Sequence, residues 1–156
     1  MPDVLIVGGG PAGSTCAWKL VRAGIECLVL DKAEFPRAKL CAGWITPEVV
    51  SDLEIDISTY PHRLLTFDHI HFRFPLMSFN PATVQHSIRR YEFDQWLLSR
   101  ADVEVRQHEV RNIRREGDFY VIDDTYRCRY LVGAGGTRCP VYRNLFRQVN
   151  PRAKEL

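Results

Sequence analysis

Near its amino terminus the sequence reads VLIVGGGPAGS from Val4 to Ser14, and this stretch predicts how the chain is built. An unbroken apolar run that ends in glycines is typical of a strand buried on both faces of a parallel sheet. Pro11 suits the first turn of a helix, and small or apolar residues then recur at helical spacing from Gly13 to Val21. A second apolar run over 25–30 follows, so the chain is predicted to open with a β-α-β unit.

Three glycines of this unit have the spacing Gly-x-Gly-x-x-Gly, which is typical of dinucleotide binding in such a context. Gly8 allows a tight turn, Gly10 lets the backbone approach a pyrophosphate, and Gly13 lets the helix pack closely on the strand. The free N–H groups around Ala12 and the helix dipole then offer an anion site. Asp31 follows the second strand, 18 residues after Gly13, near the spacing of a ribose-binding carboxylate. A glycine turn that binds no ligand is the alternative.

After Asp31 the chain does not continue as regularly alternating strands and helices. Residues 32–61 read as irregular, and residues 67–74 alternate in the manner of a half-buried strand that 83–88 could pair with. The other predicted elements are a helix over 91–101 and strands over 103–105, 109–113, 119–122 and 130–132. The last of these strands runs into a second glycine cluster, Gly133 to Gly136, which we expect near the same crevice. This inserted β-rich region favours a flavin over NAD as the ligand.

Five ordered segments resemble the geranylgeranyl reductase-like flavoproteins, which belong with the FAD oxidoreductases of the aromatic-hydroxylase type. The segments are residues 4–14, residues 35–43 (FPRAKLCAG), residues 89–97 (RRYEFDQWL), the short strand at Val110, and residues 133–141 (GAGGTRCPV). The resemblance extends from Asp3 to Arg143, although Gly135 stands where the family has an aspartate. It implies an α/β fold, a Rossmann-like FAD-binding domain with an inserted antiparallel β region.

The resemblance also implies FAD as the cofactor and a set of residues around it. Arg90 would contact the cofactor phosphate, and Cys41 would lie beside the flavin, either as a packing residue or as a reactive thiol. The implied cofactor-binding residues are Gly8, Gly10, Pro11, Ala12, Gly13, Asp31, Arg37, Cys41, Ala42, Arg90, Val110, Gly133 and Gly136. No catalytic acid or base is predicted. No metal site is predicted either, because His69 and His71 share one strand face without an evident third ligand.

Length, charge and cysteine content bear on the number of domains, on nucleic-acid binding and on the cellular compartment. The chain has 156 residues, enough for one domain, and its formal net charge of +2 gives no indication of nucleic-acid binding. No secretory leader or membrane-spanning apolar run is recognisable. The five cysteines show no C-x-x-C spacing, which favours reduced thiols and a cytoplasmic protein.

We expect an FAD-binding domain over 1–143, with 60–90 as its inserted β segment, and a polar tail over 144–156. The family continues with a Gly-Asp segment that holds the flavin's ribityl chain and pyrophosphate, and this sequence lacks it in the required context. The chain is therefore expected to be the amino-terminal portion of such an enzyme.

The resemblance implies flavin-mediated hydride transfer with NAD(P)H as a candidate electron donor. The implied substrate is a small molecule or an isoprenoid lipid, which would bring peripheral membrane contact with it. Two alternatives stay open. One is a catalytically incomplete FAD-binding module that needs self-association or a complementing chain, and the other is an NAD-dependent dehydrogenase domain.

Overall fold

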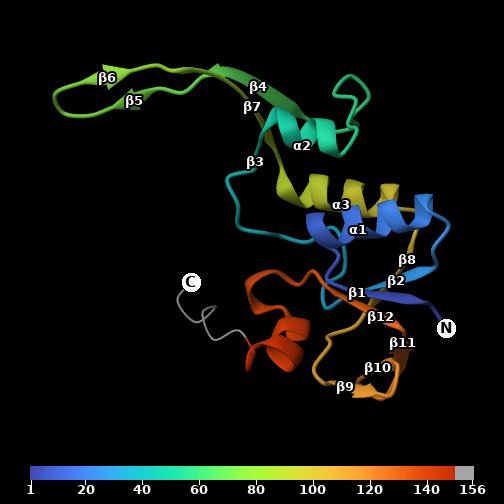
Figure 1. Ribbon diagram of the computed structural model, residues 1–156. Coiled ribbons are helices and arrows are strands. Elements are labelled where there is room, and N and C mark those ends of the chain that lie inside the picture. Colours follow the sequence, from blue (N-terminus) through green and yellow to red (C-terminus); the bar gives the residue numbers. More distant parts are fainter. Residues whose placement is uncertain (150–156) are drawn as a thin grey trace. The chain divides into compact units, whose positions relative to one another are not determined.

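The computed structural model describes residues 1–149, which form two compact units: residues 1–37 with 94–149, and residues 38–93. The first unit is built on a parallel sheet in the order β12-β1-β2-β8 (Figure 1). Its strands are β1 (Val4–Val7), β2 (Cys27–Asp31), β8 (Glu104–Gln107) and β12 (Tyr130–Gly133). All three strand pairs are parallel, and β1 lies in the interior of the sheet, fully buried. The predicted β-α-β opening and the predicted strand at 130–132 are confirmed.

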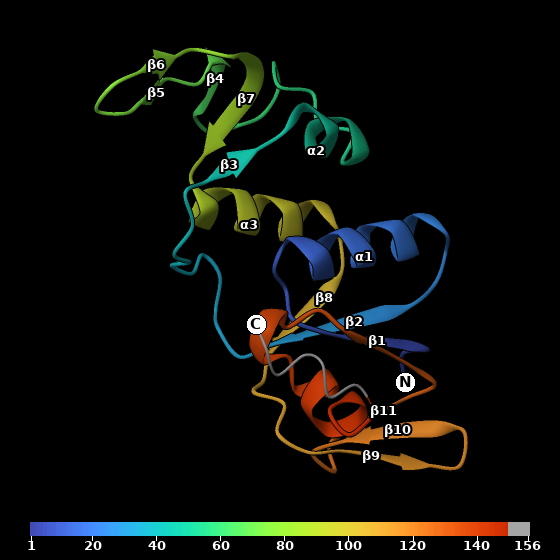
Figure 2. The same ribbon diagram turned by 60° about the vertical axis from the view of Figure 1, so that its left-hand side comes forward.

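Helix α1 (Pro11–Arg22) connects β1 to β2 and covers one face of the sheet (Figure 2). It begins at a proline, where the missing N–H costs nothing, and basic side chains occupy its last turn. The apolar cluster beneath it takes alternate residues of the strands together with the end of α3 (Arg90–Arg100). Its buried members are Val4, Ile6, Ala17, Trp18, Val29, Leu98 and Ala101.

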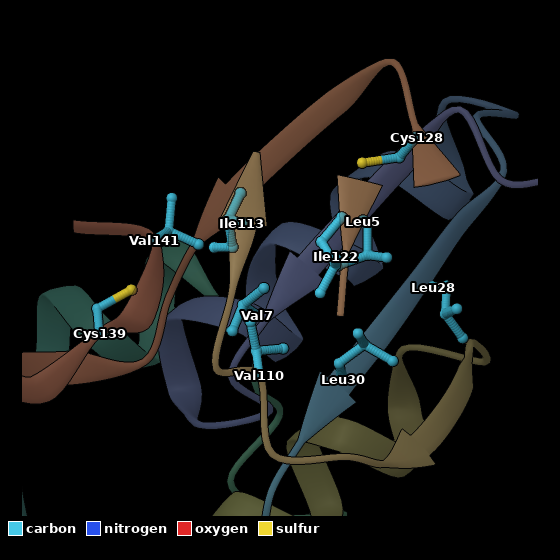
Figure 3. Close-up of a cluster of buried hydrophobic side chains, with 10 residues drawn as sticks. All are labelled: Leu5, Val7, Leu28, Leu30, Val110, Ile113, Ile122, Cys128, Cys139 and Val141. Carbon is cyan, nitrogen blue, oxygen red and sulfur yellow. The ribbon is translucent and has the colours of Figure 1, made fainter. Parts of the chain in front are cut away.

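The other face of the sheet packs against an antiparallel sheet of β9 (Ile113–Glu116), β10 (Phe119–Ile122) and β11 (Tyr126–Cys128). Because side chains alternate along a strand, Leu5 and Val7 point to this face while their neighbours point to α1. Figure 3 shows the resulting cluster, which Cys139 and Val141 complete from the carboxyl-terminal segment. Burial on both faces explains the unbroken apolar runs of β1 and β2.

The strand predicted over 109–113 is wrong, because regular pairing starts only at Ile113. Instead of joining a ladder, the N–H groups of Arg111 and Asn112 donate to the carboxylate of Asp123, at 3.1 Å and 2.7 Å from its nearest oxygens. Residues 116–118 form the turn between β9 and β10, and Gly117 adopts a positive φ of 59° there.

The second unit contains a sheet in the order β3-β7-β4 and a two-stranded hairpin of β5 and β6. Strand β4 pairs antiparallel with β7, which confirms the predicted partnership of these segments. The elements are β3 (Trp44–Ile45), α2 (Pro47–Asp52), β4 (Leu64–His69), β5 (Phe72–Arg73), β6 (Ser78–Phe79) and β7 (Ala82–Ile88).

Two expectations for this region need correction. The strand over 67–74 is interrupted after His69, and its aromatic side chains are exposed rather than half-buried. Residues 32–61 are not wholly irregular, because Pro47 opens α2 after Thr46 in an extended conformation. The compact second unit spans 38–93, a wider segment than the insertion expected over 60–90.

The beginning of the expected polar tail is part of the first unit. A single helical turn of π type, η2 (Tyr142–Phe146), brings Leu145 against the core cluster. The side-chain amide of Asn144 donates to the carbonyl oxygens of Pro140, at 2.8 Å, and Arg111, at 3.2 Å. Residues 150–156 of that tail lie outside the described residues. Over residues 1–149, no helix has both the length and the apolar character needed to cross a membrane.

Candidate functional site: the glycine turn after strand β1

The turn between β1 and α1 has a geometry that only glycine permits. Gly8 adopts a φ of +111°, and a Cβ there would lie 2.5 Å from the carbonyl oxygen of Ala134. A Cβ at Gly13 would overlap the carbonyl oxygen of Gly8, so α1 approaches the turn as closely as backbone atoms allow. These are the two roles, tight turn and close helix packing, that the sequence predicted for Gly8 and Gly13.

The second glycine segment lies beside this turn. The N–H of Ala134 donates to the carbonyl of Val7 at 2.8 Å, and β12 pairs with β1 as far as Gly133. Gly136 follows, exposed and with a φ of +72°, as the first residue of the short 3-10 helix η1 (Gly136–Arg138). The expectation that both glycine clusters meet at one edge of the sheet is therefore confirmed.

The amino terminus of α1 opens at the same edge. Gly10 precedes the helix in an extended conformation and gives it no side-chain cap, and the first turn carries no acidic residue. The hydroxyl of Ser14 is turned inward, donating to the carbonyl of Gly10 at 3.0 Å. Because the first N–H groups of a helix lack intrahelical partners, those of Ala12 and Gly13 present a partial positive charge to this edge.

Asp31 ends β2 next to the turn and is nearly buried, with 9% of its surface exposed. Its Oδ2 accepts a hydrogen bond from the N–H of Gly9 at 2.7 Å, and its Oδ1 accepts one from the N–H of Ala33 at 2.9 Å. The carboxylate thus fixes the glycine turn to the end of β2. Each oxygen has a second lone pair, so this arrangement is compatible with the predicted bond to a ribose hydroxyl.

Arg37 brings a positive charge to the turn. Its Nη2 lies 3.2 Å from the position that a Cβ of Gly10 would take, and 3.7 Å from Oδ2 of the fully buried Asp94. The guanidinium also lies over the ring of Phe35, 4.9 Å from its centroid. Sequence reasoning included Arg37 but missed Asp94 and Phe35. The signal was available, because both belong to segments that match the family's motifs.

Three predicted site residues belong to the second unit. Cys41 and Ala42 are exposed, and Arg90 is half-buried at the start of α3. The Sγ of Cys41 accepts a weak hydrogen bond from the N–H of Gly43 at 3.5 Å. Their contact with a cofactor stays a prediction. Val110, in the first unit, is buried in the core, which leaves only its backbone for the contact with adenine that we expect.

The cysteines and histidines differ in exposure and partners. The five cysteines, all within residues 1–149, form no disulfide with one another, and burial raises the pKa of Cys128 to about 11, so this thiol is unreactive. His69 contacts Asp68 and His71 contacts Asn80. Over residues 1–149, no three or more His, Cys, Asp or Glu side chains are grouped in a way that could hold a metal ion.

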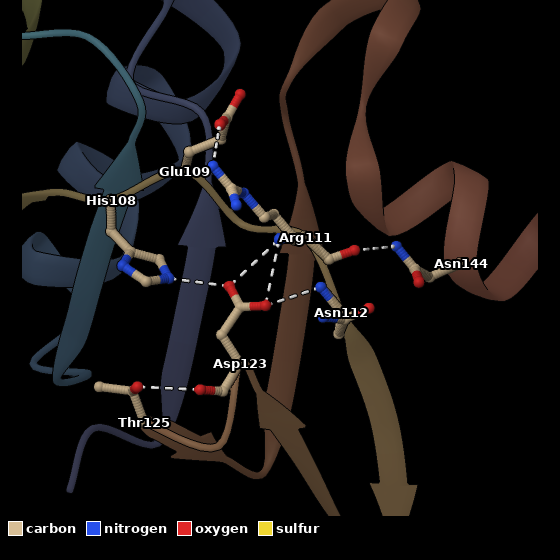
Figure 4. Close-up of polar contacts among 7 residues, drawn as sticks. All are labelled: His108, Glu109, Arg111, Asn112, Asp123, Thr125 and Asn144. Atoms are coloured by element: carbon tan, nitrogen blue, oxygen red, sulfur yellow. Dashed lines mark hydrogen bonds and ion pairs between the residues drawn. The ribbon is translucent and has the colours of Figure 1, made fainter.

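A polar cluster that the sequence did not suggest lies close to the end of β2 (Figure 4). It holds the antiparallel sheet of β9, β10 and β11 in place. His108 donates its backbone N–H to the carbonyl of Asp31 at 2.7 Å and contacts Asp123 through its ring at 2.8 Å. Partial burial would raise the pKa of Asp123, but hydrogen bonds from Asn112, His108 and Arg111 outweigh it and lower that pKa. The cluster is structural, since its bonds connect segments of one unit.

Comparison with known proteins agrees with this geometry. The family described as NAD(P)-binding Rossmann-like domain matches residues 6–68. An uncharacterized protein of Methanosarcina barkeri is 35% identical over 90% of this chain and 39% of its own length. For the geranylgeranyl diphosphate reductase of Rhodobacter capsulatus, the identity is 36% over 64% of this chain and 25% of the relative. The menaquinone reductase of Mycolicibacterium smegmatis is 33% identical over 93% of this chain and 40% of its own length.

Among solved structures, the FAD-dependent halogenase CndH superposes with a TM-score of 0.72 at 23% identity, over 88% of this chain and 38% of the halogenase. The predicted Rossmann-like fold with added antiparallel sheets is therefore confirmed, and so is the resemblance to geranylgeranyl reductase and related flavoproteins. The chain spans about 40% of the length of most of these proteins.

Proposed function

We propose that the chain binds FAD and forms the cofactor-binding part of an oxidoreductase that acts on isoprenoid or quinone lipids. The observation that carries this proposal is the glycine turn, whose backbone leaves no room for a Cβ at Gly8 or Gly13 and which has Arg37 beside it. The names of the relatives supply the substrate class, since those proteins reduce geranylgeranyl diphosphate and menaquinone.

The residues at the turn fit the pyrophosphate of a dinucleotide. Gly8, Gly10 and Gly13 let the backbone approach it, and Pro11 and Ala12 place the first turn of α1 so that its N–H groups face the phosphates. Arg37 adds a full positive charge next to Gly10. Asp31 accepts a ribose hydroxyl while it holds Gly9 in position.

The remaining predicted residues would extend the site beyond the phosphates. Arg90 would neutralise further phosphate charge, Cys41 and Ala42 would line the flavin, and the backbone at Val110 would lie near adenine. Gly133 and Gly136 supply the second backbone approach. When bound, FAD supplies the redox chemistry, taking hydride from a donor such as NAD(P)H and passing it to the substrate.

We also propose that the protein works in the cytoplasm, because its five cysteines, all within residues 1–149, form no disulfide with one another. A lipid substrate would bring it into peripheral contact with a membrane. Turnover would depend on further protein, either the rest of a longer chain or a complementing partner, because the relatives are longer than this chain.

An NAD-binding domain is the second candidate, since the matching family is described as NAD(P)-binding. Thermal unfolding of the purified chain with FAD, NAD or riboflavin separates the two. We expect saturable stabilisation by FAD of about 2.7 kcal/mol at a hundred times its Kd. Stabilisation by NAD alone, or by no dinucleotide, would overturn the proposal. Riboflavin is the control, because it lacks the pyrophosphate and should stabilise the chain far less.

A further inference from the structure

The second unit carries an exposed hairpin over residues 70–81, which continues beyond the ends of β4 and β7 (Figure 1). Phe72 pairs with Phe79, and Arg73 pairs with Ser78. The N–H of Phe74 donates to the carbonyl of Met77 at 2.8 Å and closes the turn. Every residue from 71 to 80 is exposed.

One face of this hairpin is apolar. The rings of Phe72 and Phe79 stack with centroids 4.9 Å apart, and Phe74 stacks on Phe79 at 6.1 Å. Met77 directly precedes β6, and its carbonyl accepts the N–H of Phe74. At the tip, Leu76 is 99% exposed and Met77 is 59% exposed. So many large apolar side chains in one exposed segment mark an interaction surface rather than scattered exposure.

The opposite face of the hairpin is polar, and its only permanent charge is positive. It carries His71, Arg73, Ser78 and Asn80, with His71 Nδ1 and Asn80 Oδ1 2.8 Å apart. Residues 70–81 contain no Asp or Glu, so Arg73 is their only permanently charged side chain. The nearest acidic residue in sequence, Asp68, lies in β4 and contacts His69.

We propose that this hairpin is a membrane anchor whose apolar face and tip insert into the interface of an anionic bilayer. Aromatic rings, a leucine and a methionine are suited to the boundary between head groups and acyl chains, and an arginine without acidic neighbours attracts anionic lipid. Shallow insertion into lipid needs only a few side chains.

The proposal rests on the second unit alone and does not depend on FAD binding. Its test is co-sedimentation of the purified chain with vesicles of phosphatidylcholine, with and without an equal share of phosphatidylglycerol. We expect binding to the mixed vesicles, weaker binding to phosphatidylcholine alone, and the same result with or without added FAD. Failure to bind either vesicle would overturn the anchor and leave the FAD proposal untouched.

Variants identify the surface. The double variant L76S/M77S should bind the mixed vesicles at least about tenfold less tightly, because it removes the two tip side chains that would enter the lipid. Leu40→Ser is the matched control, since Leu40 is fully exposed in the same unit but lies outside the hairpin. Arg73→Gln should reduce the preference for phosphatidylglycerol and leave binding to phosphatidylcholine unchanged.

Three results would contradict the assignment. Equal losses in L76S/M77S and Leu40→Ser would show that any exposed leucine contributes as much. Unchanged binding in L76S/M77S, with circular dichroism showing the native fold, would place the lipid contact elsewhere. If sedimentation equilibrium shows a dimer that L76S/M77S dissociates while vesicle binding persists, the hairpin is a protein contact and not an anchor.

Discussion

At the scale of single residues, the proposed nucleotide site depends on groups that hold the glycine turn and present charge to it. Asp31 shows how one side chain can do both. Its oxygens already accept the N–H groups of Gly9 and Ala33, and the second lone pairs are available to a ligand. Asp31 should therefore contribute to the free energy of unfolding through its bonds to Gly9 and Ala33, and to FAD affinity through its remaining lone pairs.

We expect Asp31→Ala to weaken FAD binding by about 1–3 kcal/mol, because it removes a charge-assisted hydrogen bond to ribose. The same change should lower the free energy of unfolding, since Gly9 and Ala33 lose their acceptor. Flavin fluorescence titration and urea unfolding measure the two effects. Asp31→Asn is the control, because it retains one oxygen for Gly9. Unchanged FAD affinity in the alanine variant would show that ribose lies elsewhere.

Arg37→Gln should weaken FAD binding by about tenfold, because the turn loses the positive charge beside Gly10. The remaining affinity should also depend less on salt concentration, since a charge pair has been removed. Arg115→Gln, on the exposed face of β9, is the matched control and should bind as the wild type does. The titration is repeated at two ionic strengths, and equal losses in both variants would exclude a specific role for Arg37.

At the scale of elements, the crossing of α1 over β1 is set by contact between backbones. Gly13→Ala would place a methyl group on the carbonyl of Gly8, and neither backbone can move without displacing the sheet. We expect a loss of about 3 kcal/mol or more in the free energy of unfolding. Gly24→Ala is the control, with a positive φ but open space around it, and should cost about 1–2 kcal/mol. Urea denaturation of both variants measures the difference.

The stability that Asp123 contributes, by connecting the segment after β8 to the sheet of β9, β10 and β11, should depend on pH. Because the pKa of Asp123 is lower in the folded chain than in the unfolded chain, its contribution to stability is present above the unfolded value of 3.8. That contribution is lost as the pH falls through the folded value. Asp123→Asn should therefore destabilise the protein at pH 7 and differ less from wild type at pH 3. A constant difference, measured by urea unfolding at both values, would contradict this assignment.

At the scale of the whole molecule, the predicted site residues are divided between two compact units. Gly8–Gly13, Asp31 and Arg37 belong to one, whereas Cys41, Ala42 and Arg90 belong to the other. If one FAD contacts them all, hydrogen exchange should slow in both units when it binds, near residues 8–13 and near 41–42 and 90. Residues 70–81 are the internal control and should exchange at an unchanged rate. Protection confined to the first unit would remove Cys41, Ala42 and Arg90 from the site.

Local sequence patterns were sufficient for the parts of the fold with short-range causes. The apolar runs of β1 and β2, the glycine spacing and Pro11 predicted the β-α-β unit and the edge where its site lies. Each of these signals is a property of neighbouring residues: an unbroken apolar run, backbone freedom at Gly8, and a proline that suits the helix start. Family resemblance added Arg37 to the site, and that residue indeed lies beside Gly10.

Only the tertiary structure decided which distant groups meet. The N–H of Gly9 donates to Asp31, and Arg37 forms an ion pair with Asp94. Asp123 accepts hydrogen bonds from N–H groups in a segment that the pattern assigned to a strand. The same holds for Phe72 and Phe74, whose alternation with polar residues indicates a strand but cannot tell whether anything covers its apolar face. Periodicity reports which side chains share a face, whereas burial and pairing depend on what the rest of the chain brings against that face.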